Sequence, residues 1–142
     1  MRGIEYIPEN FNIEELVHPW VLNKIGVHNS WLRLDSGVLR DLDLIRKEWG
    51  SSIFINIGVH DSRGLRPPND PDGSYHSVHK QGKAFDLVPA TGDYRGLWRL
   101  VHRMVLEKKL ESINTLEDFR FTRGWVHVAK MNTSLRPLII KP

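Results

Sequence analysis

The sequence predicts an α+β fold, with helices flanking a small antiparallel sheet in a single domain. Some segments of the 142 residues repeat apolar side chains every three or four positions, as helices do. Between them lie short runs rich in β-branched and aromatic residues, which are typical of strands. The chain has the length of one domain and contains no internal repeat or dividing linker. We therefore expect residues 1–142 to form one domain.

The amino-terminal segment carries the weakest pattern. We expect residues 1–34 to be an irregular arm packed on the rest of the domain. Within it, a short helix should run from Ile13 to about Leu22, broken at His18-Pro19 because proline interrupts helical hydrogen bonding.

Two segments predict helices with one buried face. Apolar residues recur at helical steps from about Val38 to Trp49, with Ser36 as the expected N-cap. A second such segment runs from about Tyr94 to Lys109, and Thr91 or Asp93 is its expected cap. Its apolar face consists of Leu97, Leu100, Val101, Met104 and Val105.

Four short segments predict the strands of the sheet: Ile53–Ile57, Lys83–Val88, Phe119–Thr122 and Trp125–Ala129. A long polar stretch rich in Gly, Pro, Asn and Asp, residues 58–80, separates the first two. Loops of this length in a compact domain are commonly functional, so we expect it to contribute to a site.

The composition limits the classes of protein that fit. Hydrophobic residues make up 40% and charged residues 26%, as in folded soluble proteins. With no cysteine, any metal would be bound by nitrogen and oxygen atoms. No apolar run is long enough to cross a membrane, and the first ten residues lack the apolar core of a signal peptide. We expect synthesis in the cytoplasm and a monomer.

The chain is mildly basic, with a net charge of +3 and a pI near 9.3. A solvated surface with a small Lys/Arg excess explains these values, and so does weak attraction to an anionic polymer. The basic residues are scattered and show no DNA-binding motif spacing, so specific nucleic-acid binding is not expected.

Three side chains suggest a metal site. His79 and Asp86 are seven residues apart, with Asp86 on a predicted strand, and His127 lies on a later strand between Val126 and Val128. Two histidines and a carboxylate form a workable catalytic zinc set that leaves one position for water. The alternative is that each is an ordinary polar side chain, since the chain has seven histidines.

The string S-x-H-x-x-G-x-A-x-D at residues 77–86, followed by W-V-H-V at 125–128, resembles the zinc D-alanyl-D-alanine carboxypeptidases. That family includes vancomycin-resistance dipeptidases and phage endolysin peptidases, and it shares a fold with the Hedgehog signalling domain. The segment FNIEEL at 11–16 also resembles an entry motif of these proteins. The resemblance covers nearly the whole chain. It implies zinc (Zn2+) bound by His79, Asp86 and His127.

The resemblance also implies residues that bind substrate. Gly64-Leu65-Arg66-Pro67 is similar to the family segment around a substrate-binding arginine, although Arg63 is a close competitor because the loop departs from the usual S-G-Y-R form. A guanidinium can bind a peptide carboxylate or a polarised carbonyl through its fork of donors. Ser77 would bind substrate or orient His79, and Gly82 would allow a tight turn beside the metal.

The general base is where the chain departs from its relatives. They often have an acidic residue three positions before the last histidine, or Asp two positions after it; here these are Gly124 and Ala129. Glu117 is the expected base, because it resembles a phage-type variant of the motif, and Asp118 is the next candidate. Both carboxylates could instead cap a turn.

The expected function is hydrolysis of a peptide bond in bacterial peptidoglycan by metal-activated water, as in a phage-type endolysin or a virion-associated wall hydrolase. A carboxypeptidase and an L-Ala–D-Glu endopeptidase would use the same site. The alternative is a non-catalytic metal-binding structural or wall-binding module on the same fold, which the residues at 124 and 129 would suit.

Overall fold

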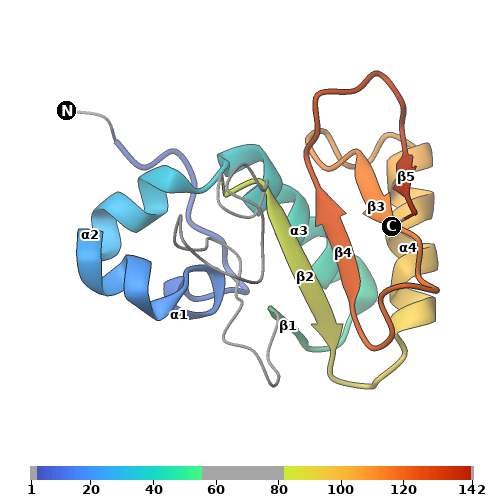
Figure 1. The fold of residues 1–142 in the computed structure, drawn as a ribbon, viewed down its shortest axis with the longest axis horizontal. Coiled ribbons are helices and arrows are strands. Elements are labelled where there is room, and N and C mark those ends of the chain that lie inside the picture. The colour runs from blue at the N-terminus through green and yellow to red at the C-terminus, as the bar shows by residue number, and fades with distance from the viewer. Residues whose placement is uncertain (1–2, 56–81, 142) are drawn as a thin grey trace.

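The computed structural model describes residues 3–55 and 82–141, and the structural statements below concern that part of the chain. Together the two ranges form one α+β domain of four helices and a five-stranded sheet, as expected for the fold class (Figure 1). In chain order the elements are α1 (Ile13–Leu16), α2 (Pro19–Arg33), α3 (Ser36–Trp49), β1 (Ile53–Ile55), β2 (Ala84–Pro89), α4 (Tyr94–Leu106), β3 (Thr115–Glu117), β4 (Val126–Ala129) and β5 (Leu138–Ile140).

The sheet is mixed rather than purely antiparallel. Its strand order is β1-β2-β4-β3-β5, and every neighbouring pair is antiparallel except β3 and β5, which are parallel. The strand β5 was not expected, because the residues after Ala129 were interpreted as a short basic tail; its side chains are partly buried. The three inner strands, β2, β4 and β3, are each bonded on both sides.

One predicted strand is wrong. Residues 119–122 form a turn, and the strand lies earlier, at Thr115–Glu117. The turn begins at Asp118, whose carbonyl accepts a hydrogen bond from the amide of Phe121. The aromatic residues at 119 and 121 have high strand propensity, which explains the prediction, but the chain reverses direction there.

The two long predicted helices are present: α3 begins at Ser36, slightly earlier than expected, and α4 ends at Leu106 rather than near Lys109. In α3 the N-cap is Asp35 rather than Ser36, because the Asp35 carboxylate accepts from the amide of Val38. Gly50 ends this helix in the left-handed conformation, with φ of 75°. Asp93, one of the two expected caps, caps α4. All five residues predicted to line its apolar face are buried.

The segment expected to be an irregular arm is mostly helical. Proline at the first position of α2 starts this helix rather than ending the preceding one, because an N-terminal amide needs no partner in the helix. Gly26, with φ of 83°, kinks α2 near its middle. Leu16 and Val17, at the end of α1, have no exposed surface.

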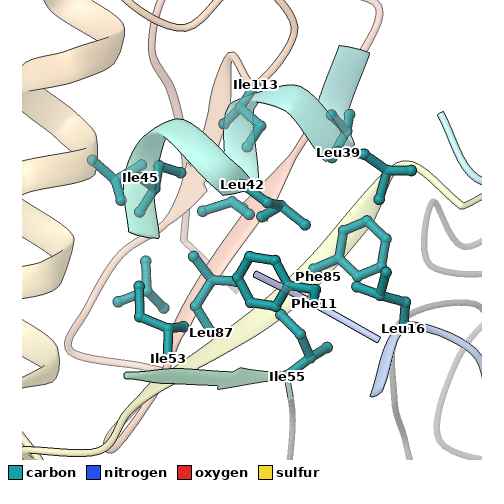
Figure 2. Packing of buried hydrophobic residues seen from close by; sticks show 14 of the residues in the cluster. Phe11, Leu16, Leu39, Leu42, Ile45, Ile53, Ile55, Phe85, Leu87 and Ile113 are labelled. Atoms are coloured by element: carbon teal, nitrogen blue, oxygen red, sulfur yellow. The ribbon is translucent and has the colours of Figure 1, made fainter. Parts of the chain in front are cut away.

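The core lies between the helices and one face of the sheet. Phe85 and Leu87 of β2 pack there close to Leu42 and Ile45 of α3 (Figure 2). Helices α3 and α4 lie behind the sheet, while α1 and α2 lie beyond its β1–β2 side (Figure 1). The side chains of β2, β4 and β3 that alternate with these core residues point to the opposite face of the sheet. No helix in the described part of the chain is long and apolar enough to cross a membrane.

Candidate metal centre

Asp86 and His127, two of the three expected metal ligands, are in direct contact. They face each other across the antiparallel pair of β2 and β4, where Asp86 is the register partner of His127. His127 Nδ1 lies 2.8 Å from Asp86 Oδ1, and the two side chains are only 12% and 11% exposed. Residues 41 positions apart in sequence are thus brought together by strand pairing.

The alternation of the strands explains why these two polar side chains avoid the core. Phe85 and Leu87 flank Asp86, and their register partners Val128 and Val126 flank His127. All four flanking side chains have no exposed surface. Because successive side chains of a strand point to opposite faces, Asp86 and His127 share the face away from α3.

Glu117 extends this pair into a row across three strands. In the β3–β4 pair, Thr115 is opposite Ala129 and Leu116 is opposite Val128. The same register continued by one residue sets Glu117 opposite His127, on the face that carries Asp86.

The electrostatics of Glu117 agree with this position. Burial raises the pKa of the Glu117 carboxyl, the nearby His127 lowers it, and the Asp86 carboxylate raises it further, with a net increase. Glu117 therefore lies within electrostatic reach of both other side chains. A carboxyl with a raised pKa is suited to accept and return a proton.

Trp98 holds the backbone beside Glu117, a role that the sequence did not reveal. Its indole Nε1 donates a 2.9 Å hydrogen bond to the carbonyl oxygen of Glu117. The ring is itself fixed by stacking on His102 and by an edge contact with Phe119. The only sequence signal is the spacing of Trp98 and His102, four residues apart on one helix, which places the two rings together.

Asp118, the second candidate for the base, caps the turn instead. Its carboxylate accepts hydrogen bonds from the backbone amide and the guanidinium of Arg120. These bonds lower the pKa of Asp118 to about 2, which leaves it a weak proton acceptor. The turn-cap alternative is therefore correct for Asp118, whereas Glu117 belongs to β3.

Gly124 and Ala129, the two positions where the family that the sequence resembles carries acidic residues, are each constrained by the local structure. Gly124 has φ of +102°, a conformation that residues with a Cβ rarely adopt. Ala129 is fully buried between its register partners Ala84 and Thr115. A carboxylate at either position would bring backbone strain or a desolvation cost.

Gly82 allows a close approach of two backbones. Its φ is +71°, and a Cβ atom there would lie 2.2 Å from the carbonyl oxygen of Arg33. The Gly82 carbonyl also accepts a hydrogen bond from the amide of Asp35. This glycine therefore joins the start of β2 to the junction between α2 and α3.

The donor atoms in the described part fit zinc chemically. Imidazole nitrogen and carboxylate oxygen are its usual ligands in a protein without cysteine. Two such atoms about 2.1 Å from one tetrahedral ion would be about 3.4 Å apart. The Nδ1–Oδ1 separation of 2.8 Å would thus need to widen only slightly.

The remaining predicted site residues, His79, Arg63, Arg66 and Ser77, lie outside the described residues. Among residues 3–55 and 82–141, no group of three or more histidine, aspartate or glutamate side chains could by itself hold a metal ion. The predicted site therefore depends on His79 as its third ligand.

Comparison with known proteins adds no relative: no family model, no curated protein and no solved structure matches the chain.

Proposed function

We propose that this protein is a zinc-dependent peptidase that cleaves a peptide bond in bacterial peptidoglycan. The observation that carries the proposal is the row of Asp86, His127 and Glu117 across β2, β4 and β3. Two of its members are the ligands that the sequence resemblance implies, and the third is the expected base. The proposed fold family is that of the D-alanyl-D-alanine carboxypeptidases and the Hedgehog domain, consistent with the α+β arrangement.

Each side chain of the row has a distinct role in this proposal. His127 and Asp86, with His79, would hold zinc, which when bound polarises a carbonyl and acidifies water. Glu117 accepts the proton of the attacking water and passes it to the departing nitrogen. Trp98 keeps the Glu117 backbone in place through its hydrogen bond. Arg66 or Arg63, and Ser77, remain the proposed substrate-binding residues.

The proposed setting is a phage-type endolysin or a virion-borne wall hydrolase. The bond cut is either the terminal D-alanine linkage or the L-Ala–D-Glu linkage of the stem peptide. Both reactions need the same ligands and base, so products must distinguish them. Mass analysis of purified muropeptides after incubation, with and without chelator, identifies the bond directly.

The test separates metal binding from catalysis. His127→Ala should lose bound zinc, measured by elemental mass spectrometry, whereas the control His28→Ala, on the exposed side of α2, should keep it. Glu117→Gln should keep zinc but release muropeptide at least about 100-fold more slowly. Its control is Glu48→Gln, an exposed position on α3. Equal zinc in His127→Ala would remove the ligand assignment, and full activity in Glu117→Gln would remove the base.

A second candidate function is a non-catalytic metal-binding module on the same fold. The residues at 124 and 129 favour it, because neither supplies the carboxylate found in relatives. Under this alternative the wild-type protein binds zinc but cleaves no muropeptide. Release of a defined fragment, abolished by chelator, would exclude it.

A further inference from the structure

A groove of about 650 Å³ lies between α3 and the segment that precedes α1. It is formed by Tyr6, Glu9 and Asn10 of that segment and by α3 from Arg40 to Lys47. Its size falls in the range of ligand-binding sites in proteins. The charged side chains that line the groove determine what it can bind.

The carboxylate of Asp43, on the α3 side of the groove, is occupied by hydrogen bonds from the other side. One oxygen accepts from the Tyr6 hydroxyl and from the Glu9 backbone amide. The other oxygen accepts from the backbone amide and the side-chain amide of Asn10. A carboxylate has about four acceptor sites, so these four donors leave none for a nearby cation.

Three cationic side chains of α3 consequently have no carboxylate partner. Arg40 and Arg46 lie three residues from Asp43, and Lys47 lies four residues from it, which is the spacing of ion pairs on a helix. Among the residues that the structure describes, none of the three forms a salt bridge. Glu9 supplies the other carboxylate among the described residues of the lining. The groove therefore carries more positive than negative charge.

The Arg40 guanidinium is positioned to bind an anion. Its Cζ lies 5.1 Å from the centre of the Tyr6 ring, a cation–π contact that restricts the side chain without using its N–H donors. A guanidinium can donate two parallel hydrogen bonds to one phosphate group. Lys47 follows two helical turns later, about 10 Å along α3. A single anion that contacts both side chains must therefore be extended and carry repeated charges.

We propose that this groove binds the phosphodiester chain of an anionic wall polymer. A chain of poly(glycerol phosphate) carries one negative charge at every repeat and no bulky side group, which suits a groove lined by spaced cations. The choice of a wall polymer rests on the proposed function.

Nucleic acid fits the same groove less well. Single strands bind on exposed aromatic rings, and duplex DNA is read by an element that enters one of its grooves. Here the Tyr6 ring is covered by the Arg40 guanidinium. Helix α3 is also flanked by the segment before α1, which is hydrogen-bonded to Asp43 along it. The groove thus favours a thin phosphodiester chain without bases.

The groove and the candidate metal centre lie on different sides of α3. Leu42 and Ile45 of this helix are buried toward the sheet, whereas Arg40 and Lys47 are exposed on the opposite side of the helix. Helix α3 itself lies behind the sheet, whose other face carries the metal centre (Figure 1). A bound polymer would thus hold the protein on the wall and leave the metal centre open, which raises the effective concentration of peptide.

The probe for the test is purified poly(glycerol phosphate), which contains no peptide bond, so that binding is measured independently of hydrolysis. Substituting Arg40→Gln, Arg46→Gln and Lys47→Gln together should weaken binding at least about tenfold at about 0.1 M salt, measured by titration calorimetry. The affinity should also depend less on salt, because fewer counterions are released. Arg40→Lys with Arg46→Lys retains the charges and should keep most of the affinity, and unchanged melting temperatures guard against misfolding.

The matched control is Lys24→Gln, Arg99→Gln and Lys109→Gln together. These three residues are exposed, and none of them lines the groove. The control removes as much positive charge as the groove variant does, from a protein of net charge +3. It therefore reports the general attraction of a basic protein to a polyanion, and it should bind nearly as wild type does.

Equal losses in the groove variant and the control would overturn the groove, because overall charge alone would then explain binding. Wild type that does not bind the polymer would overturn it as well. Tighter binding of a DNA oligonucleotide or of phosphatidylglycerol vesicles, lost in the groove variant, would assign the groove to another anion and overturn the wall polymer. A protein that cleaves muropeptide but does not bind the polymer would remove the groove alone. One that binds the polymer through the groove but cleaves nothing would remove the peptidase alone.

Discussion

Individual residues in this protein act mainly by joining segments that are distant in sequence. Asp43 of α3 is an example: it accepts hydrogen bonds from the hydroxyl of Tyr6 and from the backbone amides of Glu9 and Asn10. These hydrogen bonds connect the segment before α1 to α3, whose apolar face lies in the core. The contact between Asp86 and His127 likewise joins distant segments, because it connects strands β2 and β4.

The Tyr6–Asp43 bond predicts a pH dependence. The hydrogen bond to Asp43, followed by burial, raises the pKa of Tyr6 to about 12. Because the folded pKa is higher than the ordinary value near 10, the bond stabilises the fold fully below pH ~10 and is lost toward pH ~12. Tyr6→Phe should lower the free energy of unfolding at pH 7 by about 1–2 kcal/mol.

Chemical denaturation of wild type and Tyr6→Phe at pH 7 to 12 measures this difference. It should shrink as the pH approaches 12. Tyr94→Phe is the matched control, because the Tyr94 hydroxyl makes no hydrogen bond among the described residues, and its effect should be small at every pH. A Tyr6→Phe effect that stays constant to pH 12 would mean that ring packing, not the hydroxyl, is responsible.

At the scale of elements, the start of α3 connects the helices to the sheet. Asp35 caps α3 through the amide of Val38, and its other oxygen is 3.1 Å from Lys130 Nζ, just after β4. Burial by itself would raise the pKa of Asp35, but these two partners give a net decrease. Its contribution to stability should thus be present above pH ~4 and lost as the pH falls through the lower folded pKa.

Two substitutions separate the cap from the charge. Asp35→Ala loses both and should cost at least about 1 kcal/mol at pH 7. Asp35→Asn keeps a good capping group and should cost less, and its difference from wild type should fade in acid. Thermal unfolding from pH 2 to 7 measures both. If the asparagine and alanine variants were equally unstable at pH 7, the cap would contribute nothing.

The elements show which parts of the fold can be predicted from sequence. Helix α3 and the buried face of α4 follow from regular apolar spacing. Gly50 marks the end of α3, because the backbone there takes the left-handed conformation that glycine adopts most easily. Helix α2 was missed because Gly26 breaks its periodicity. The prediction placed this strand at 119–122 instead of Thr115–Glu117, because Phe119 and Phe121 have high strand propensity. The turn that they form depends on the Asp118 side chain.

The same reasoning applies to the candidate site. Asp86, His127 and Glu117 were identified from residue types and a motif resemblance, but their alignment in one row needed the strand register. Trp98 was not singled out, because an indole in a helix carries no signal of what it faces. Residue chemistry is thus predictable from sequence, whereas the neighbours of a side chain depend on how distant strands pair.

At the scale of the whole molecule, the proposed ligands lie where a metal would stabilise the entire fold. Asp86 and His127 belong to β2 and β4, which are bonded on both sides in the five-stranded sheet. These strands can separate only when the sheet and the core on its other face are disrupted. Metal bound across them therefore opposes global unfolding rather than local fraying.

Zinc should accordingly raise the melting temperature in a concentration-dependent manner. At a free concentration 100 times the dissociation constant, binding to the folded state alone adds about 2.7 kcal/mol to the free energy of unfolding. Scanning calorimetry over a zinc series measures the shift, and chelator should reverse it. His127→Ala should show little or no shift, while His28→Ala should respond as wild type does. An equal rise in His127→Ala would place the stabilising ion elsewhere on the molecule, and the strand pair would then have no part in binding it.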